Sequence, residues 1–222
     1  EMLELAANGA KVLHLRCVEY ARRSGTPLRV RSSFTDSPGT LVTTAEELEG
    51  AAVEAPIISG VAHDLGEAKI TIAGVRDEPG RAALVFEILA TADINIDMIV
   101  QNVSAAGITD ITFTLPMSDG DKAMAVLRGN KNEIGYETVT YDDQVAKVSL
   151  VGAAMRSHPG VSATTFRALA DAGINVEMIS TSEIRISVVV RAEDVTRAVQ
   201  AIHTAFGLDA DGEAVVYAGT GR

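Results

Sequence analysis

Disulfides, membrane spans and a secretion signal are missing from this sequence. Its one cysteine, Cys17, cannot form an internal disulfide, which agrees with a reducing compartment. No apolar run approaches the roughly 20 residues that cross a bilayer, and the first residues lack the basic start and apolar core of a signal peptide. We therefore expect a cytoplasmic protein without a membrane partner.

Basic charge is scarce as well. The chain has 19 Lys and Arg residues against 30 Asp and Glu residues, so its formal net charge is −11. No Lys- or Arg-rich run provides a local basic surface. A phosphate backbone would therefore be repelled, and we expect no nucleic acid as a partner.

Motifs for metals, phosphates and catalysis are also absent. The four histidines are far apart, and no CxxC or HExxH pattern gives them metal-ligand spacing. No GxxxxGK[ST] phosphate loop occurs, and no nucleophile is paired with a base. We expect no metal ion, no cofactor and no catalytic residue in this chain.

What the sequence does contain is a segment that occurs twice. Residues 76–99, RDEPGRAALVFEILATADINIDMI, return 80 positions later as residues 156–179, RSHPGVSATTFRALADAGINVEMI. Twelve of the 28 positions in 75–102 are identical in the second copy. A gapless match of this length indicates a duplication, and a chain of 222 residues is long enough for more than one domain.

Each copy, with its flanking residues, follows the element order βαββαβ. In the first unit we expect strands at 68–75, 94–103, 109–116 and 136–143, and helices at 79–93 and 119–130. In the second unit we expect strands at 146–153, 174–181, 183–191 and 213–219, and helices at 160–173 and 193–206. The predicted fold class is α+β, with two tandem ferredoxin-like units, each an antiparallel sheet with two helices on one face.

Two segments lie outside this repeat. Residues 55–74 resemble a hairpin of two strands, and the extra strand at 57–63 is a candidate to complete the second sheet. Residues 1–50 do not match the repeat, and they contain a helical pattern that ends at Gly25, then an alternating strand pattern. We expect a tail at 1–50, a first unit at 64–142 and a second unit at 143–222.

The duplicated polar residues indicate a site for a free amino acid. A Pro-Gly turn opens each predicted first helix, whose unpaired N–H groups attract a carboxylate. The strands that follow offer backbone carbonyls and the amides of Asn95, Asn175 and Gln101 to an ammonium group. A plain turn at Pro-Gly and a bend at each asparagine are the alternative, which these residues alone leave open.

These segments resemble a known family. Residues 77–104, DEPGRAALVFEILATADINIDMIVQNVS, are similar to the ACT domains of aspartate kinases, and STSEIRIS at 180–187 is a specific match to their second ACT domain. Residues 1–50 resemble the end of the amino-acid-kinase catalytic fold, while the family's KFGG-type motif is absent. The chain thus resembles the regulatory β subunit, or C-terminal regulatory region, of aspartate kinase, which is not an enzyme by itself.

The resemblance implies that effectors bind between paired ACT units. One site would be threonine-like, with Asp77 on the α-ammonium and Gln101 on the hydroxyl; the other would be lysine-like, with Asp97 and Glu183 on the ε-ammonium. The threonine-like site comprises Asp77, Gly80, Arg81, Ala82 and Gln101, completed by Ile174, Asn175 and Val176 of the paired unit. The lysine-like site comprises Met155, His158, Gly160, Val161, Ser162, Ser182 and Glu183, completed by Asn95 and Asp97.

Simpler structural roles compete with several of these assignments. Asp77 is also suited to capping its helix, and Asp97 and Glu177 to lying as solvated charges at strand edges. Phe86, Phe166, Met98 and Met178 are expected in the core. By resemblance, Ser104 and Thr112 occupy positions at which changes relax feedback control.

The expected function is feedback regulation of aspartate kinase by threonine, with lysine left open as a second effector. The expected partners are free amino acids, the catalytic (α) subunit and a second copy of the chain. The alternative within the family is an ACT-type sensor or structural partner of another biosynthetic enzyme. RNA-recognition modules share the βαββαβ order, but nine aromatic residues and an acidic net charge argue against one.

Overall fold

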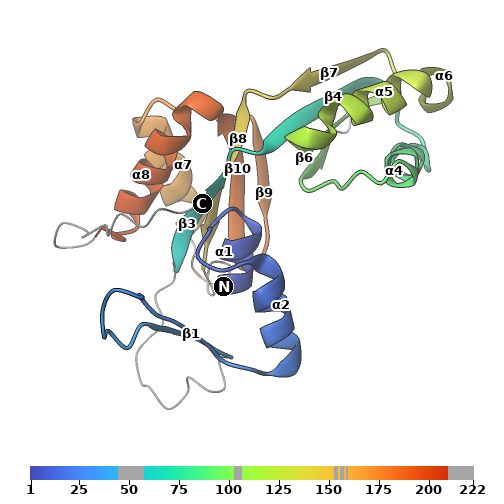
Figure 1. Ribbon diagram of the computed structural model, residues 1–222. Coiled ribbons are helices and arrows are strands. Elements are labelled where there is room, and N and C mark those ends of the chain that lie inside the picture. Colours follow the sequence, from blue (N-terminus) through green and yellow to red (C-terminus); the bar gives the residue numbers. More distant parts are fainter. Residues whose placement is uncertain (45–57, 103–106, 153–154, 156–157, 159, 210–222) are drawn as a thin grey trace.

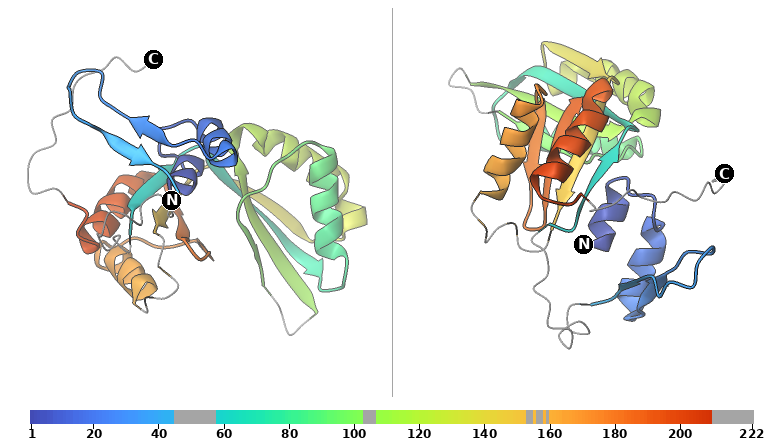
Figure 2. Two further views of the ribbon diagram at one scale, coloured as in Figure 1. Left: turned by 90° about the horizontal axis from the view of Figure 1, so that it is seen from below. Right: turned by 90° about the vertical axis from the view of Figure 1, so that its left-hand side faces the viewer.

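The computed structural model describes residues 1–44, 58–102, 107–152, 155, 158 and 160–209 (Figure 1). These residues form a tail and two α+β units, each with a four-stranded antiparallel sheet. The expected closing strand at 213–219 lies outside the described residues. Figure 2 shows the same arrangement from two further directions.

The first unit has the predicted βαββαβ order. Its sheet runs β5-β6-β4-β7, so the first strand of the unit, β4, lies in the middle of the sheet. Its strands are β4 (Glu67–Arg76), β5 (Ile99–Gln101), β6 (Ile108–Pro116) and β7 (Thr138–Asp142). Its helices are α4 (Arg81–Thr91), the 3-10 turn η1 (Met117–Asp119), α5 (Gly120–Gly129) and α6 (Lys131–Ile134).

The second unit repeats this plan with one strand taken from earlier in the chain. Its sheet runs β3-β8-β10-β9, and β3 (Gly60–Asp64) occupies the place that β7 has in the first unit. The other strands are β8 (Val145–Val151), β9 (Met178–Thr181) and β10 (Arg185–Arg191). The helices are α7 (Val161–Asp171), the 3-10 turn η3 (Ala192–Asp194) and α8 (Val195–Ala205).

The predicted fold class is confirmed, but the hairpin expected at 55–74 is wrong. Strands β3 and β4 follow one another closely and pair in different sheets, β3 with β8 and β4 with β6 and β7. The chain turns at Gly66, whose backbone N–H donates to the Asp64 carboxylate at 2.8 Å. Two strand patterns joined by a short turn resemble a hairpin in sequence. The pattern does not specify which sheet supplies the partner of each strand.

Each unit has its own apolar core between its sheet and its helices. The core of the first unit centres on Phe113, whose ring meets the Phe86 ring edge-on at 5.9 Å between centroids. The core of the second unit contains Leu150, Val188 and Leu169, with Phe166 packed against it. Alternate strand residues point to the opposite face of each sheet, where they are placed to contact the tail or the other unit.

The tail docks on the second unit. It comprises α1 (Met2–Ala7), α2 (Leu15–Ser24) and the antiparallel strands β1 (Leu28–Val30) and β2 (Thr40–Val42). Asn8, at the end of α1, is 1% exposed and accepts hydrogen bonds from Ser149 (3.1 Å) and Arg185 (3.3 Å). Ser149 alternates along β8 with the core residues Val148 and Leu150, so α1 lies on the sheet face opposite α7 and α8.

The helical pattern of the tail is two helices rather than one. The Asn8 side chain donates to the Glu4 carbonyl at 2.8 Å and ends α1, and Gly9 follows with a left-handed φ of 97°. Only the second helix, α2, ends at Gly25 as predicted. The break escapes a periodicity argument because apolar residues keep helical spacing on both sides of it.

Gly9→Ala should release the tail. A Cβ at Gly9 would lie 2.0 Å from the His63 carbonyl oxygen of β3, an overlap with backbone that costs about 1–3 kcal/mol, or roughly 5- to 150-fold in the docking equilibrium. Hydrogen exchange in α1 measures this directly. Gly25→Ala is the matched control, because Gly25 also has a positive φ (61°) but nothing within 4 Å. Equal exchange in the two variants would contradict the docking geometry.

Candidate functional site

The predicted threonine-like residues of the first unit lie together at one end of its sheet. Asp77, Gly80, Arg81 and Ala82 follow the end of β4, and the Asp77 backbone N–H donates to the Gly107 carbonyl at 3.0 Å. Gly80 is the N-cap of α4 with a φ of 93°, a conformation that favours glycine. Among the described residues no side chain caps this helix, so Asp77 does not have the capping role considered as its alternative.

Arg81 is held by its own unit. Its guanidinium pairs with the Glu78 carboxylate at 3.0 Å and donates to the Glu133 carbonyl at 3.4 Å. Asp77 and Gln101 are exposed, and Gln101 lies on β5 opposite Ile111 of β6. This end of the unit therefore presents a helix N-terminus with an exposed carboxylate and an exposed amide nearby.

The second unit repeats the arrangement at α7. Gly160 is the N-cap with a φ of 112°, Val161 is buried and Ser162 is exposed in the first turn. Met155 is buried against the core of this unit, and His158 is exposed. Ser182 and Glu183 are exposed in the turn between β9 and β10.

Within one chain, the two halves of each predicted site do not meet. The loop at 77–82 follows the C-terminal end of β4, whereas the partner segment 174–176 lies near the opposite end, because Glu177 bonds Lys69. Lys69 and Arg76 are seven steps apart along β4, which is roughly 23 Å at about 3.3 Å per residue. Asn95 and Asp97 are separated from the turn at 182–183 in the same manner, because Asp97 bonds Lys147 near the start of β8.

Charged side chains join the two units where these segments meet. Lys147 of the second unit bonds Glu67 (2.8 Å) and Asp97 (2.5 Å) of the first. Lys69 of the first unit bonds Glu177 of the second. Asp142 and Arg191 pair at 2.7 Å beside them, and Arg191 also contacts Glu177 at 3.3 Å.

The ion-paired residues between the units occupy positions that the duplication relates to one another. Lys69 and Lys147 occupy equivalent positions in KITIAG and KVSLVG, and Asp97 and Glu177 are 80 residues apart, as in the repeat. Each unit thus supplies a lysine to the carboxylate of the other. Asp97 and Glu177 were predicted without lysine partners, although a lysine repeated within an apolar strand is a signal that a buried partner lies opposite it.

Asp97 and Glu177 are therefore ion-paired between units; Glu177 is half-buried, whereas Asp97 pairs with Lys147 and stays exposed to solvent, as its alternative expected. This also bears on the lysine-like site. The Asp97 carboxylate, which resemblance assigns to an effector's ammonium, already holds the ammonium of Lys147. An effector at this position would have to share Asp97 or displace Lys147.

Burial and ion pairing shift the pKa values of Glu67 and Lys147. Burial raises the pKa of the Glu67 carboxyl above its ordinary 4.5, an effect that bonding to Lys147 only partly offsets. Burial would lower the pKa of Lys147, but the hydrogen bonds that its ammonium donates to Asp97 and Glu67 outweigh burial, and the pKa lies above 10.5. One Glu67 carboxylate oxygen has no hydrogen-bond partner among the described residues. Lys147 is therefore shared by two carboxylates, of which Glu67 is buried and Asp97 is exposed.

Met98 and Met178 also lie at this junction rather than in the core of either unit. They are 2% and 5% exposed, and they pack with Val145 and Val189 in a separate apolar cluster between the units. Both methionines were predicted to be core residues, and both are buried. The apolar cluster lowers the local polarity, which strengthens the neighbouring ion pairs.

Thr112 lies on the open face of the first sheet. Its hydroxyl is 3.1 Å from the Thr71 hydroxyl on β4, and both residues are half-buried. Ser104, the other position linked to feedback control by resemblance, lies outside the described residues.

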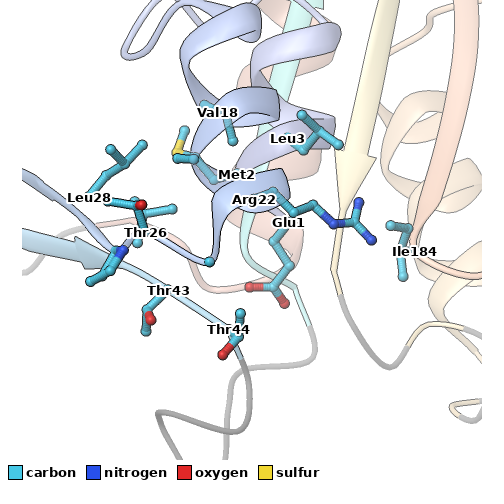
Figure 3. Close-up of a pocket in the computed structure, with 14 residues that line it drawn as sticks. Glu1, Met2, Leu3, Val18, Arg22, Thr26, Leu28, Thr43, Thr44 and Ile184 are labelled. Carbon is cyan, nitrogen blue, oxygen red and sulfur yellow. The ribbon is translucent and has the colours of Figure 1, made fainter.

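A cavity of about 380 Å³ lies between the tail and the second unit (Figure 3). Its wall is mainly apolar, with Leu3, Val18 and Leu28 from the tail and Ile184 from the β9–β10 turn. Glu1 and Arg22 add charge, and Thr43 has a buried hydroxyl without a hydrogen-bond partner among the described residues. None of the predicted site residues lines this cavity, but Ile184 directly follows Glu183.

In the described part of the chain, no three His, Cys, Asp or Glu side chains come together as metal ligands. Within the same residues, no helix is long and apolar enough to cross a membrane.

Sequence comparison matches residues 70–130 and 148–206 to a model of the ACT domain. The aspartokinase of Mycolicibacterium smegmatis is 58% identical over all of this chain and 53% of its own length, and that of Corynebacterium glutamicum is 56% identical over the same shares. The chain thus spans about half the length of these relatives.

Solved structures give the same match. The ligand-free regulatory subunit of aspartate kinase from Thermus thermophilus is 42% identical with a TM-score of 0.65, and the match covers 68% of this chain and 99% of that one. Aspartate kinase from Synechocystis is 37% identical with a TM-score of 0.68, over 95% of this chain and 38% of that one.

Lys147→Met should destabilise the chain by about 3–5 kcal/mol at pH 7, because it leaves the buried Glu67 carboxylate without its cation. Urea unfolding measures the loss. Because the pKa of Glu67 is raised, the folded state binds more protons than the unfolded state at pH values above 4.5. The free energy of unfolding should therefore rise as the pH falls from 7 towards 4.5. This recovery should be greatest in Lys147→Met.

Lys122→Met, at an exposed lysine, is the matched control and should change stability by less than about 0.5 kcal/mol. If Lys147→Met lost no more stability than this control, the buried ion pair would not be a structural requirement.

Proposed function

The chain belongs to the aspartate kinase family and carries its regulatory ACT domains, and on this premise we propose that it senses threonine and passes that signal to a catalytic partner. The observation that carries the proposal is the pair of helix N-termini, each opened by a glycine with positive φ and each with one polar side chain at its first two positions, Arg81 in α4 and Ser162 in α7. Such an N-terminus attracts the α-carboxylate of an amino acid. Asp77 then takes the α-ammonium and Gln101 the threonine hydroxyl.

Two copies of the chain are needed to complete each site. Because the two halves lie at opposite ends of the sheets within one chain, the segment at 174–176 has to come from a second copy. The edge strands β5 and β9 suit this pairing, since neither has a second neighbour in its sheet among the described strands. Ile99 and Ile179, at equivalent positions on these strands, are 50% and 47% exposed. We therefore propose a homodimer in which a first unit meets the second unit of the partner.

Threonine is the primary effector in this account, and lysine is the second candidate. The lysine-like site has Glu183 for an ε-ammonium, but Asp97 is engaged by Lys147. A solved structure of E. coli aspartokinase III, 25% identical to this chain, contains lysine and aspartate. Lysine binding here therefore requires that the effector share Asp97 with Lys147 or displace Lys147 from it.

The tail supplies the route to the catalytic partner. The regulatory-subunit match covers 68% of this chain, whereas the match to the longer Synechocystis enzyme covers 95%. We therefore assign the tail to the end of the catalytic fold. Arg185, two residues after Glu183, bonds Asn8 and lies 3.6 Å from Glu4 of α1. A shift in the β9–β10 turn on effector binding would thus reach α1 directly.

Titration calorimetry with threonine, and separately with lysine, tests the sensing function. Gln101→Ala should weaken threonine binding about tenfold, the value of one hydrogen bond of roughly 1.4 kcal/mol. Gln144→Ala, at an exposed glutamine in the link between the units, is the matched control and should bind normally. A folded dimer that bound neither amino acid would rule out sensing by this chain alone.

Ile99→Lys should make the protein monomeric, because it places a charge on the proposed dimer edge. Light scattering coupled to gel filtration gives the mass, and threonine affinity should fall with it. Leu65→Lys is matched in exposure (51% against 50%) and lies in the turn between β3 and β4. That control should remain a dimer, and a dimeric Ile99→Lys would refute pairing through β5.

A further inference from the structure

The two inter-unit lysines hold the chain immediately beside the proposed effector contacts. Asp97 follows Asn95 and Ile96, and Glu177 follows Asn175 and Val176. These segments connect helix to strand and have no strand pairing of their own before Met98 and Met178. Their position therefore depends on the anchors at Asp97 and Glu177.

Each anchor has a backbone part and a side-chain part. The Asp97 N–H donates to the Thr114 carbonyl at 3.0 Å, and the Met98 N–H donates to the Thr114 hydroxyl at 3.1 Å. The Glu177 N–H likewise donates to the Val189 carbonyl at 2.9 Å. These bonds fix each segment to its own sheet, whereas the side chains of Asp97 and Glu177 reach lysines of the other unit.

We propose that Lys147 and Lys69 are positioning residues for the effector sites and that they act crosswise. Lys147, in the second unit, fixes the segment that carries Asn95 of the first unit. Lys69, in the first unit, fixes the segment that carries Asn175 of the second. The part about effector affinity rests on the proposed function, but the crossed clamping of the two segments does not.

The two clamps differ in strength. Lys147 is 3% exposed, and no other cation among the described residues pairs with Asp97 or Glu67. Lys69 has a substitute, because Arg191 lies 3.3 Å from Glu177. Loss of Lys147 therefore frees its segment more completely than loss of Lys69.

Hydrogen exchange of the full chain, read in overlapping peptides, tests the clamps without any effector. Lys147→Met combined with Glu67→Gln removes the clamp and leaves no charge stranded at Glu67, so the protein folds. This variant should exchange at least about tenfold faster at 95–98 and be unchanged at 175–178. Lys69→Met should show the reverse pattern with a smaller increase.

Two controls separate positioning from general loosening. Glu67→Gln alone retains the pair between Lys147 and Asp97 and should leave exchange at 95–98 unchanged. Lys147→Arg keeps the charge and should restore most of the protection there. Equal changes in both segments, or no change in either, would overturn the crossed clamp.

Threonine affinity gives the second readout. The threonine-like site uses Asn175, so Lys69→Met should weaken threonine binding about fivefold. The Lys147→Met, Glu67→Gln double variant should bind threonine as wild type does. If wild type bound no threonine, the proposed function would fail while hydrogen exchange still decided the clamp. If wild type bound and both variants lost affinity equally, the crosswise assignment would be wrong.

Discussion

The junction between the two units is organised around one constraint, the burial of Lys147. An ammonium that is almost fully removed from water requires anionic partners, and Glu67 and Asp97 provide them from the other unit. This requirement sets how the start of β8 meets the start of β4. The apolar cluster of Met98, Met178 and their neighbours then excludes water from the contact. The relative position of the units follows from this junction rather than from either core.

Under the proposed function, the duplication explains why a single chain would not complete its own effector site. The units meet at the starts of their first strands, whereas the helix N-termini lie at the other ends. A site that needs both features has to draw them from two chains. In this account sensing therefore requires dimerisation, because residues of the partner chain complete each effector site. The tail, docked through Asn8 on the second sheet, lies within reach of that event.

Much of this was accessible from the sequence, for physical reasons that also explain the failures. The repeated apolar spacing and the two Pro-Gly turns predicted the βαββαβ units, because apolar spacing marks the face of a helix or strand that is buried. Local patterns do not specify partners, so β3 was read into a hairpin and the break at Gly9 was missed. The helix N-termini at Gly80 and Gly160 were predicted from turn chemistry. The pairing of Lys147 with Asp97 depends on contacts 50 residues apart and needed the structure.

The most direct measurement of the central claim, that each threonine site is shared by two chains, is a complementation titration. Chains carrying Gln101→Ala and chains carrying Asn175→Ala are each titrated with threonine alone, then after mixing and subunit exchange. A mixed dimer has one site with both changes and one with neither. The account predicts weak binding by each variant alone and one restored high-affinity site per mixed dimer. Mixed dimers that bind no better than the separate variants would place the whole site within one chain and contradict it.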